Sequence, residues 1–253
     1  MSAAFRIKSA GVTHEGRKRD HNEDALLLRE GEGAWAVADG MGGHENGEWA
    51  SSAIVEALRA APLGEDFDRS VAALAEAIHT ANGHIYRTAL AGNVRMGSTV
   101  VALLIGDERF ACLWAGDSRI YLLRGGVLHR LTQDHTRVQD LIEAGMLTPD
   151  EAKGHPMSHV LSRAVGVQAE LELDAVSDKV AHNDVFLLCS DGLTGPVSEP
   201  EIADCMSAPP SEACRRLLEL TLDRGAPDNV TVAVIACEEM TALSFAAADR
   251  GLG

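Results

Sequence analysis

Residues 35–40 read WAVADG, a short apolar run that ends in an acid and a glycine. The same arrangement recurs in residues 112–117, which read CLWAGD, and in residues 186–192, which read FLLCSDG. A short apolar run bounded by turn residues is typical of a buried β-strand. Each stretch therefore predicts a strand that carries a carboxylate at its end. The acids concerned are Asp39, Asp117 and Asp191.

A fourth carboxylate, Asp228, stands just before the apolar residues 230–236. If that last strand runs antiparallel to the other three, all four carboxylates gather at one end of the sheet. A single Asp-Gly pair is usually only a turn, but four acids at equivalent strand ends favour a shared site. Acids that close keep their charge only when cations lie between them. Oxygen ligands with no nearby cysteine or His-x-x-x-His pair indicate Mg²⁺ or Mn²⁺ rather than zinc.

The rest of the chain alternates strands with amphipathic helices and has no internal repeat or Gly/Ser linker, so we expect one domain. Capping boxes at residues 148–151 and 198–201 predict two helix starts. Strands outnumber helices and the helices come in pairs, which predicts an α+β fold in which helices cover an antiparallel sheet system. The middle four of the expected strands read as an antiparallel meander. The strands are residues 25–28, 34–38, 98–105, 110–114, 119–123, 127–131, 185–189 and 230–236.

The composition excludes several classes of protein. The chain has 253 residues, 46% of them hydrophobic, which suits one large globular domain. Its 22 Lys and Arg against 38 Asp and Glu give a formal charge of −16, which argues against nucleic acid or an anionic membrane as partner. No stretch is apolar enough for a membrane span and residues 1–10 lack a secretory signal, so we expect a cytoplasmic protein. Five cysteines without a Cys-x-x-Cys pair favour reduced, packed thiols.

A charged segment, residues 19–24 (RDHNED), directly precedes the first of these strands. Arginine has a planar guanidinium that suits a phosphate, and Arg19 would supply positive charge to an acidic metal site. The alternative interpretation is a solvated charged turn. The short distance along the chain to residues 39–43 favours the functional interpretation.

Six short motifs follow one another between about Gly11 and Ala236. They are Arg19-x-x-Asn22-Glu23-Asp24, Asp39-Gly40-Met41-Gly42-Gly43, Gly97-Ser98-Thr99, Gly116-Asp117-Ser118-Arg119-x-Tyr121, Ser190-Asp191-Gly192 and Asp228-Asn229-x-Thr231. Each motif alone is weakly specific, but in this order and spacing the set resembles the metal-dependent type 2C protein Ser/Thr phosphatases, particularly the bacterial members.

The resemblance implies a four-layer αββα sandwich, in which helix pairs flank two antiparallel sheets and a binuclear Mn²⁺ or Mg²⁺ centre lies at one end. It implies that Asp39 bridges both metals and that Asp191 and Asp228 hold one of them. Gly40 would supply its carbonyl, and Asp24, with Glu23 beside it, would bind the second metal directly or through water. Asp117 together with Asp191 matches a third metal site of bacterial relatives.

The resemblance also implies the substrate contacts. Arg19 matches the phosphate-binding arginine, and residues from about 141 to 166 match a flap on which His155 and His159 could touch substrate. Water activated between two divalent ions would attack the phosphorus, so neither a cysteine nor a serine nucleophile is needed. Met41 stands where eukaryotic relatives carry a histidine proposed as general acid. His44 or a metal-bound water are the candidates for that role.

The resemblance implies a phosphoprotein phosphatase that opposes a bacterial Ser/Thr kinase, with phosphorylated proteins, the kinase and its targets as partners and a role in secretion-system regulation as one possibility. We expect a monomer with one catalytic domain, residues 1–240, and a C-terminal tail, residues 241–253. One alternative is a non-catalytic regulatory or binding module of the same fold, which would have lost ligand acids. Another is an unrelated metal-dependent hydrolase such as a phosphodiesterase, which would usually carry histidine-rich ligand clusters.

Overall fold

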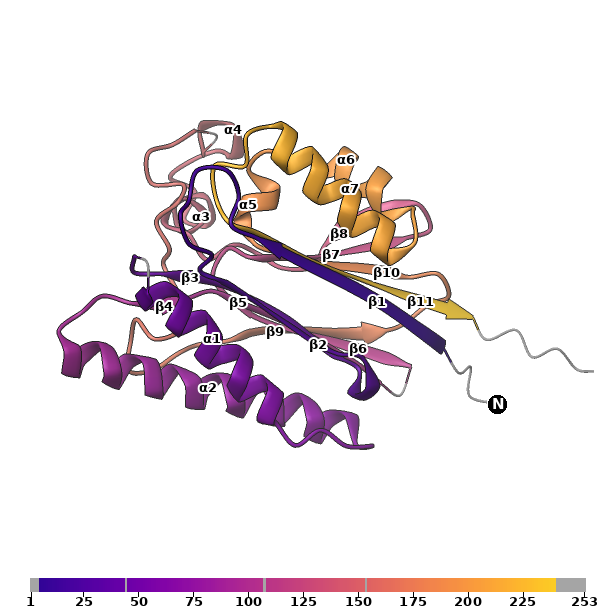
Figure 1. Cartoon of the computed structure of the whole chain (residues 1–253), viewed down its shortest axis with the longest axis horizontal. Helices are drawn as coiled ribbons and strands as arrows, with labels where there is room; N and C mark the ends of the chain where they lie inside the picture. Colours follow the sequence, from indigo (N-terminus) through magenta and orange to yellow (C-terminus); the bar gives the residue numbers. More distant parts are fainter. Residues whose placement is uncertain (1–4, 44, 107, 153, 240–253) are drawn as a thin grey trace, which may run out of the picture.

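Two antiparallel sheets lie face to face, and helix pairs cover their outer faces (Figure 1). The structure, a computed structural model, describes residues 5–43, 45–106, 108–152 and 154–239. One sheet has the strand order β1-β11-β10-β7-β8, and the other has the order β2-β3-β5-β6-β9 with β4 paired to β3. This confirms the α+β fold that the sequence pattern predicts and the four-layer sandwich that the resemblance implies.

The elements have the following bounds. The strands are β1 (Phe5–His14), β2 (Asp24–Arg29), β3 (Ala34–Met41), β4 (Gly97–Ser98), β5 (Val100–Gly106), β6 (Arg109–Ala115), β7 (Arg119–Arg124), β8 (Val127–Arg130), β9 (Asp174–Lys179), β10 (Val185–Cys189) and β11 (Val230–Glu239). The helices are η1 (Glu30–Glu32), α1 (Glu45–Ala60), α2 (Phe67–Gly92), α3 (Arg137–Glu143), α4 (Pro149–Ala152), α5 (Asp191–Thr194), α6 (Glu199–Met206) and α7 (Pro210–Asp223).

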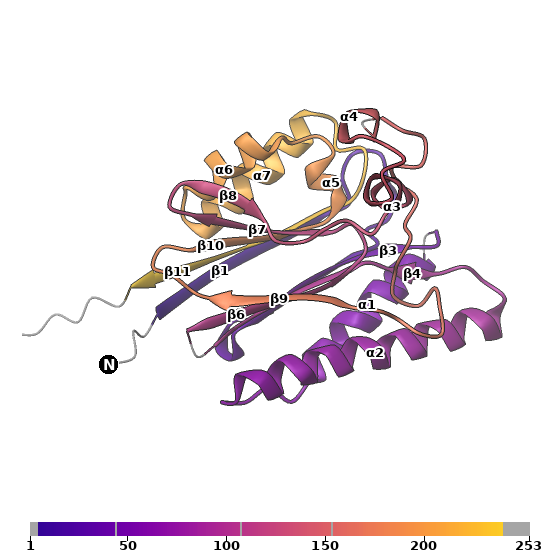
Figure 2. The same ribbon diagram turned by 180° about the vertical axis from the view of Figure 1, so that it is seen from behind.

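Three hydrophobic layers hold the sandwich together, one under each helix pair and one between the sheets. Because successive side chains of a strand point to opposite faces, Ala36 packs toward α1 and α2 while Trp35 and Val37 fill the space between the sheets. A strand buried on both faces reads as a continuous apolar run. This explains why the central strands are so visible in the sequence. Figure 2 shows the same layers from behind, with α1 and α2 under one sheet and α6 and α7 over the other.

Side-chain caps fix the helix starts. Ser198 and Glu201 form the expected capping box of α6, and Thr148 with Glu151 forms the expected box of α4. Asp66 caps α2 by accepting a hydrogen bond from the backbone N–H of Arg69 at 3.0 Å. Each cap satisfies N–H groups that a helix leaves without partners in its first turn.

The meander expected in the middle of the chain is wrong. Strands β5 and β6 pair with each other, as do β7 and β8, but β6 belongs to one sheet and β7 to the other. The chain crosses between the sheets at Gly116, whose φ of 114° is accessible mainly to glycine. The crossing places Asp117 between the ends of the two sheets rather than in an ordinary hairpin.

Two strands are absent from the sequence-based prediction. Both lie at an edge of a sheet, where β1 pairs only with β11 and β9 only with β6. Edge strands need little apolar surface, and most side chains of β9 are exposed. Their sequences therefore lack the apolar runs on which the other strands were identified. All five cysteines are free and buried, as expected.

Candidate metal centre

Asp39 lies at the end of β3, where the neighbouring strand segment fixes its backbone. The N–H of Thr99 donates to the carbonyl of Asp39 at 2.8 Å, and the N–H of Asp39 donates to Thr99 Oγ1 at 3.1 Å. Ser98 Oγ donates to the same Asp39 carbonyl at 2.9 Å. Residues 97–99 stood out in the sequence as a motif with no assigned role. Their role in the structure is to hold the Asp39 backbone.

Asp24 faces Asp39 across the β2–β3 pair, since the two residues are direct register partners. Its side chain is buried, and Ser190 Oγ donates to Asp24 Oδ2 at 2.8 Å. Within the described residues, the second oxygen, Oδ1, is buried without a hydrogen-bond partner. Burial, with the nearby charges of Asp191 and Asp228, raises the pKa of Asp24 to about 7. A buried carboxylate oxygen without a partner is the kind of atom that a cation would satisfy.

Asp191 and Asp228 come from the other sheet. Asp191 follows β10 and begins the short helix α5, while Asp228 precedes β11. Gly192 lets these two segments approach, because a Cβ on Gly192 would lie 1.8 Å from the carbonyl oxygen of Asn229. Burial, and then the charge of Asp228, raises the pKa of Asp191. Within this sheet the expectation from the sequence is met, because β11 runs antiparallel to β10.

Arg19 lies beside this pair of acids, as the sequence predicts. Its Nη2 donates to Asp228 Oδ2 at 2.8 Å, and more than half of the side chain is exposed. Asn229 anchors the loop that carries Arg19, because its Nδ2 donates to the carbonyls of Glu15 and His21. The Asn229 Oδ1 also accepts from the N–H of Glu23 at 2.9 Å. Asn229 is therefore the connection between β11 and the N-terminal loop.

Glu23 and Gly40 meet at the start of α1. The N–H of Gly40 donates to the carbonyl of Glu23 at 3.0 Å. The Glu23 carboxylate lies against Gly47 in α1, where a Cβ would be only 1.8 Å from Glu23 Oε2. Only glycine at position 47 leaves room for that carboxylate in this position. The structure thus brings Glu23 and Gly40 to the same edge of the cavity as Asp39.

Asp117 enters the site from the crossing between the sheets. Burial, and then the charges of Asp191 and Asp134, raises the pKa of Asp117 to about 7. Asp134 also lines the cavity and forms a two-pronged ion pair with Arg119, at 2.9 and 2.6 Å. Sequence reasoning did not select Asp134, which precedes a histidine in a polar segment. Asp134 lies apart from the strand-end acids in the sequence, so the pattern that identified those acids does not include it.

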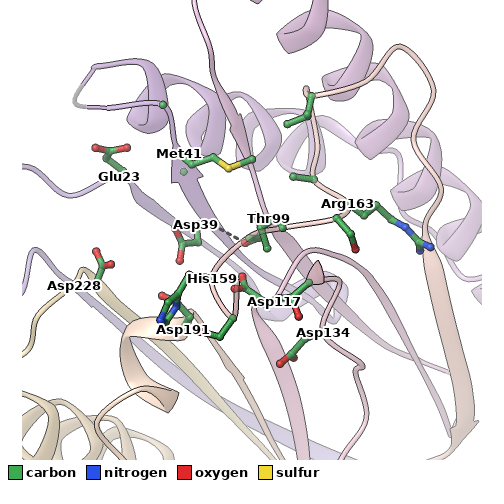
Figure 3. A pocket seen from close by; sticks show the side chains of 18 of the residues that line it. Glu23, Asp39, Met41, Thr99, Asp117, Asp134, His159, Arg163, Asp191 and Asp228 are labelled. Carbon is green, nitrogen blue, oxygen red and sulfur yellow. Dashed lines mark hydrogen bonds between the residues drawn. The ribbon is translucent and has the colours of Figure 1, made fainter. Parts of the chain in front are cut away.

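Of the two histidines in residues 141–166, the expected flap, one lines the cavity and the other does not. His159 lines the cavity close to Asp191 (Figure 3), whereas His155 accepts a hydrogen bond from the N–H of Met157 within the flap. The structure therefore brings His159 to the site and leaves His155 outside the cavity lining. The candidate His44 lies outside the described residues.

His135 connects the flap to the acidic end of the sheets. The ring atom Nδ1 of His135 accepts from the backbone N–H of Gly116 at 3.1 Å, and the backbone N–H of His135 donates to the Gly116 carbonyl at 2.9 Å. Its carbonyl accepts from the N–H of Ser162, while Nε2 faces Asp174 at 3.2 Å. Asp174 in turn binds Arg163 at 2.7 Å. The base of the flap and the turn before Asp117 thus share one hydrogen-bonded unit.

The carboxylates face a common cavity of about 1790 Å³, in which Asp39 lies between Asp228 and Asp117 in the view of Figure 3. Burial, and then the charges of Asp24, Asp191, Asp117 and Asp228, raises the pKa of Asp39 well above its usual value. In residues 5–239 apart from 44, 107 and 153, no three acid, histidine or cysteine side chains already converge on one ion position, so the acids surround the cavity rather than a point.

This donor set fits hard divalent cations. It offers carboxylate oxygens, one of them, on Asp24, buried without a partner in the described residues. Burial and the neighbouring negative charges raise the pKa values of Asp24 and Asp117, and a bound cation would offset both effects. Among the described residues that line the cavity there is no cysteine. None of the helices in the described residues is long and apolar enough to cross a membrane.

Known proteins resemble this chain in sequence and in fold. A family profile described as protein phosphatase 2C matches residues 10–230. The serine/threonine protein phosphatase PstP of Mycobacterium tuberculosis is 38% identical over 236 residues, which cover 90% of this chain and 44% of PstP. The chain therefore spans less than half the length of that relative. Protein phosphatase PhpP of Streptococcus pneumoniae is 34% identical over 237 residues, covering 90% of this chain and 96% of PhpP.

Solved structures agree. PppA, described as a key regulatory component of the T6SS in Pseudomonas aeruginosa, superposes with a TM-score of 0.86 at 42% identity and covers 91% of this chain and 97% of its own. The catalytic domain of PstP in complex with two manganese ions superposes with a TM-score of 0.81 at 34% identity, covering 93% of this chain and 100% of that one.

Proposed function

Since this chain belongs to the protein phosphatase 2C family, we propose that it hydrolyses phosphoserine and phosphothreonine on proteins at a binuclear Mn²⁺ or Mg²⁺ centre. The observation that carries the proposal is the meeting of acids from both sheets at one cavity, with Asp39 from one sheet and Asp191 and Asp228 from the other. The manganese-bound structure of PstP supports the choice of metal.

The residues divide the work as follows. We assign Asp39 to both metals, Asp191 and Asp228 to one of them, and Asp24 with Glu23 and the Gly40 carbonyl to the second. Asp117 with Asp191 would hold a third ion. When bound, such ions lower the pKa of water and stabilise charge on phosphoryl oxygens. No protein nucleophile is required, and the free cysteines lie in the hydrophobic layers.

Arg19 is placed to hold the phosphate. A guanidinium has five N–H groups, and the ion pair with Asp228 uses one of them. The remaining donors are available on an exposed side chain, so a phosphate can be bound without breaking the pair. Asp228 fixes the direction of the guanidinium, which lowers the entropy cost of binding the substrate.

Proton donation to the leaving group needs a group other than Met41, whose thioether has no proton to give. We keep His44 and a metal-bound water as the candidates for this role. His159, which faces the cavity beside Asp191, is the flap residue that we expect to contact substrate. The single catalytic domain, with residues 141–166 as its flap, is part of the same proposal.

The test is hydrolysis of p-nitrophenyl phosphate and of a phosphothreonine peptide with and without Mn²⁺. We expect activity only with the metal, and a loss of at least about a hundredfold in Asp39→Asn or Asp191→Asn, because each change removes a charged ligand while keeping the side-chain shape. Asp223→Asn is the matched control, since Asp223 is exposed at the end of α7, away from the cavity. Full activity in EDTA would refute the metal-dependent mechanism.

A non-catalytic module of the same fold is the second candidate. The acids assigned to the metals are all present. Glu23, Asp39, Asp117, Asp191 and Asp228 line the cavity, and Asp24 lies buried as the register partner of Asp39, which favours catalysis over a degenerate relative. The two candidates separate on one measurement, because a non-catalytic module would hydrolyse no phosphate ester even when Mn²⁺ is present.

We further propose that the physiological partners are a bacterial Ser/Thr kinase and its targets, in regulation of a secretion system. The likeness to PppA, a regulatory component of the T6SS, supports this assignment. A comparison of phosphoproteomes from cells with and without the gene tests it. Phosphorylated secretion components should accumulate in cells that lack the gene, and an unchanged set of secretion phosphoproteins would contradict the proposal.

A further inference from the structure

The cavity does not end at the carboxylates. It continues along the C-terminal end of α2 and the segment after the flap, where its lining changes from acidic to apolar. We call this part the apolar end of the cavity. It is lined by Met41, Leu90, Val94, Met96 and Val167.

Met41 joins the apolar end to the metal centre. A Cβ on Gly97 would lie 2.9 Å from Met41 Cε and 2.8 Å from Val167 Cγ2, so both side chains lie over the bare backbone of Gly97. Met41 is two residues from Asp39 and pairs in register with Gly97. In Figure 3 its side chain extends to the side of Asp39 away from Asp228. The residue without a proton to donate thus forms apolar surface next to the reacting groups.

The outer part of the apolar end is exposed. Leu90 is 63% exposed, Val167 48% and Val94 38%. Single exposed apolar side chains are common, but several along one concave surface are typical of a binding site. Because these side chains share a cavity with the acids, a ligand bound there would lie beside the reacting phosphate.

Arg95 adds a positive charge between Val94 and Met96. The four other arginines of the described cavity lining are paired with acids: Arg19 with Asp228, Arg119 and Arg130 with Asp134, and Arg163 with Asp174. Arg95 is exposed and lines the cavity, and within the described residues it makes no hydrogen bond or ion pair. The guanidinium of Arg95 is therefore free to bind an acidic group of a ligand in this cavity.

We propose that the apolar end binds the substrate segment that flanks the phosphorylated residue, and that it selects an apolar side chain together with an acidic one. The proposal rests on the proposed phosphatase function and names its preferred substrate class. The occupant is the phosphoprotein substrate itself, because the carboxylates and the apolar end line one continuous cavity, so residues beside the phosphorylated one can reach this surface. An anionic membrane would be repelled by the net charge, and a concave cavity wall suits an extended peptide.

The test uses phosphothreonine peptides of equal length in four versions. An apolar or a serine residue is placed on one side of the phosphothreonine and an acidic or a lysine residue on the other, which gives the four peptides, and the set of four is repeated with the two positions exchanged. We expect kcat/KM with Mn²⁺ to be roughly tenfold higher for the apolar and acidic version than for the serine and lysine version, mainly through KM.

Variants locate the selectivity. Val167→Ser should reduce the preference for the apolar residue roughly three- to tenfold, because it removes the contact at the wall. Val127→Ser, at an exposed valine of the β7–β8 hairpin, is the matched control and should keep the preference. Arg95→Glu should reverse the preference for the acidic residue, whereas Arg59→Glu on α1 should not.

The outcomes separate the two proposals. Equal kcat/KM for all four peptides in an enzyme that hydrolyses them would overturn the subsite while leaving the phosphatase function intact. Hydrolysis of none of them in the presence of Mn²⁺ would overturn both. A preference that survives in Val167→Ser and Arg95→Glu would also overturn the assignment to this surface, and circular dichroism of each variant establishes that it is folded.

Discussion

Arg19 is the residue that we expect to contribute to substrate binding but little to the stability of the fold. Its side chain is mostly exposed and its ion pair with Asp228 is at the surface, so the pair adds little to stability. We expect Arg19→Ala to raise KM for p-nitrophenyl phosphate roughly tenfold or more while the free energy of unfolding changes by less than about 0.5 kcal/mol. Steady-state kinetics and urea unfolding check this. Lys18→Ala in the same loop is the control, and an unchanged KM in Arg19→Ala would remove Arg19 from the phosphate site.

The raised carboxylate pKa values make a prediction about pH. In the folded protein without metal, Asp24 and Asp117 have a pKa of about 7 against an ordinary value of 3.8. Between about pH 4 and pH 7 the folded state therefore binds more protons than the unfolded state, and the free energy of unfolding falls as pH rises. The melting temperature in EDTA should be several degrees lower near pH 8 than near pH 5.5.

Mn²⁺ should reverse this trend, because ions compete with the protons for the same oxygens. The gain in melting temperature on adding Mn²⁺ should be larger near pH 8 than near pH 5.5, as measured by differential scanning fluorimetry at both pH values. Asp24→Asn should flatten the dependence in EDTA. A melting temperature in EDTA that rises steadily toward pH 8 would contradict the assignment of raised pKa values.

At the scale of elements, the link between the flap and β6 depends on His135. Its side chain joins Gly116 to Asp174, and its carbonyl accepts from Ser162. We expect His135→Ala to lower the free energy of unfolding by about 1–3 kcal/mol, since it leaves buried polar groups without partners. Cleavage within residues 141–166 should become faster in limited proteolysis, because the base of the flap loses one of its attachments.

The control for this variant is His129→Ala, which removes an exposed histidine from β8. Urea unfolding of both variants measures the difference in stability, and mass spectrometry of the digests locates the cut. Equal stability and equal cleavage rates in the two variants would show that His135 does not hold the flap.

At the scale of the whole molecule, the metal centre should act as a clamp between the sheets. Asp24 and Asp39 come from one sheet, while Asp191 and Asp228 flank strands of the other. A ligand that binds only the folded state stabilises it by about 2.7 kcal/mol at a hundred times its Kd. We expect Mn²⁺ to raise the urea midpoint of the wild type by the concentration of urea that corresponds to this free energy. We expect no such rise in Asp39→Asn. An equal gain in the variant would place the bound ion elsewhere.

Much of the molecule follows from local sequence. The central strands are buried on both faces and so appear as unbroken apolar runs, and the capping boxes at Thr148 and Ser198 mark helix starts by local hydrogen bonding. The position of each acid beside a strand is also a local feature, because the acid stands next to the apolar residues of that strand in the sequence.

The assignment of strands to sheets was decided only by the tertiary structure. Residues 98–131 look like one meander because hairpin signals are local. The sheet to which β6 and β7 belong depends instead on pairing with the distant strands β9 and β10 and on the layers that bury their faces. The same holds for Asp134 and Arg95, whose importance comes from neighbours far away in the sequence. Local sequence is enough to show which carboxylates lie at strand ends. The packing of the two sheets brings these carboxylates into one cavity that also has an apolar end. Their proximity arises from burial between segments far apart in the sequence, and no local pattern encodes it.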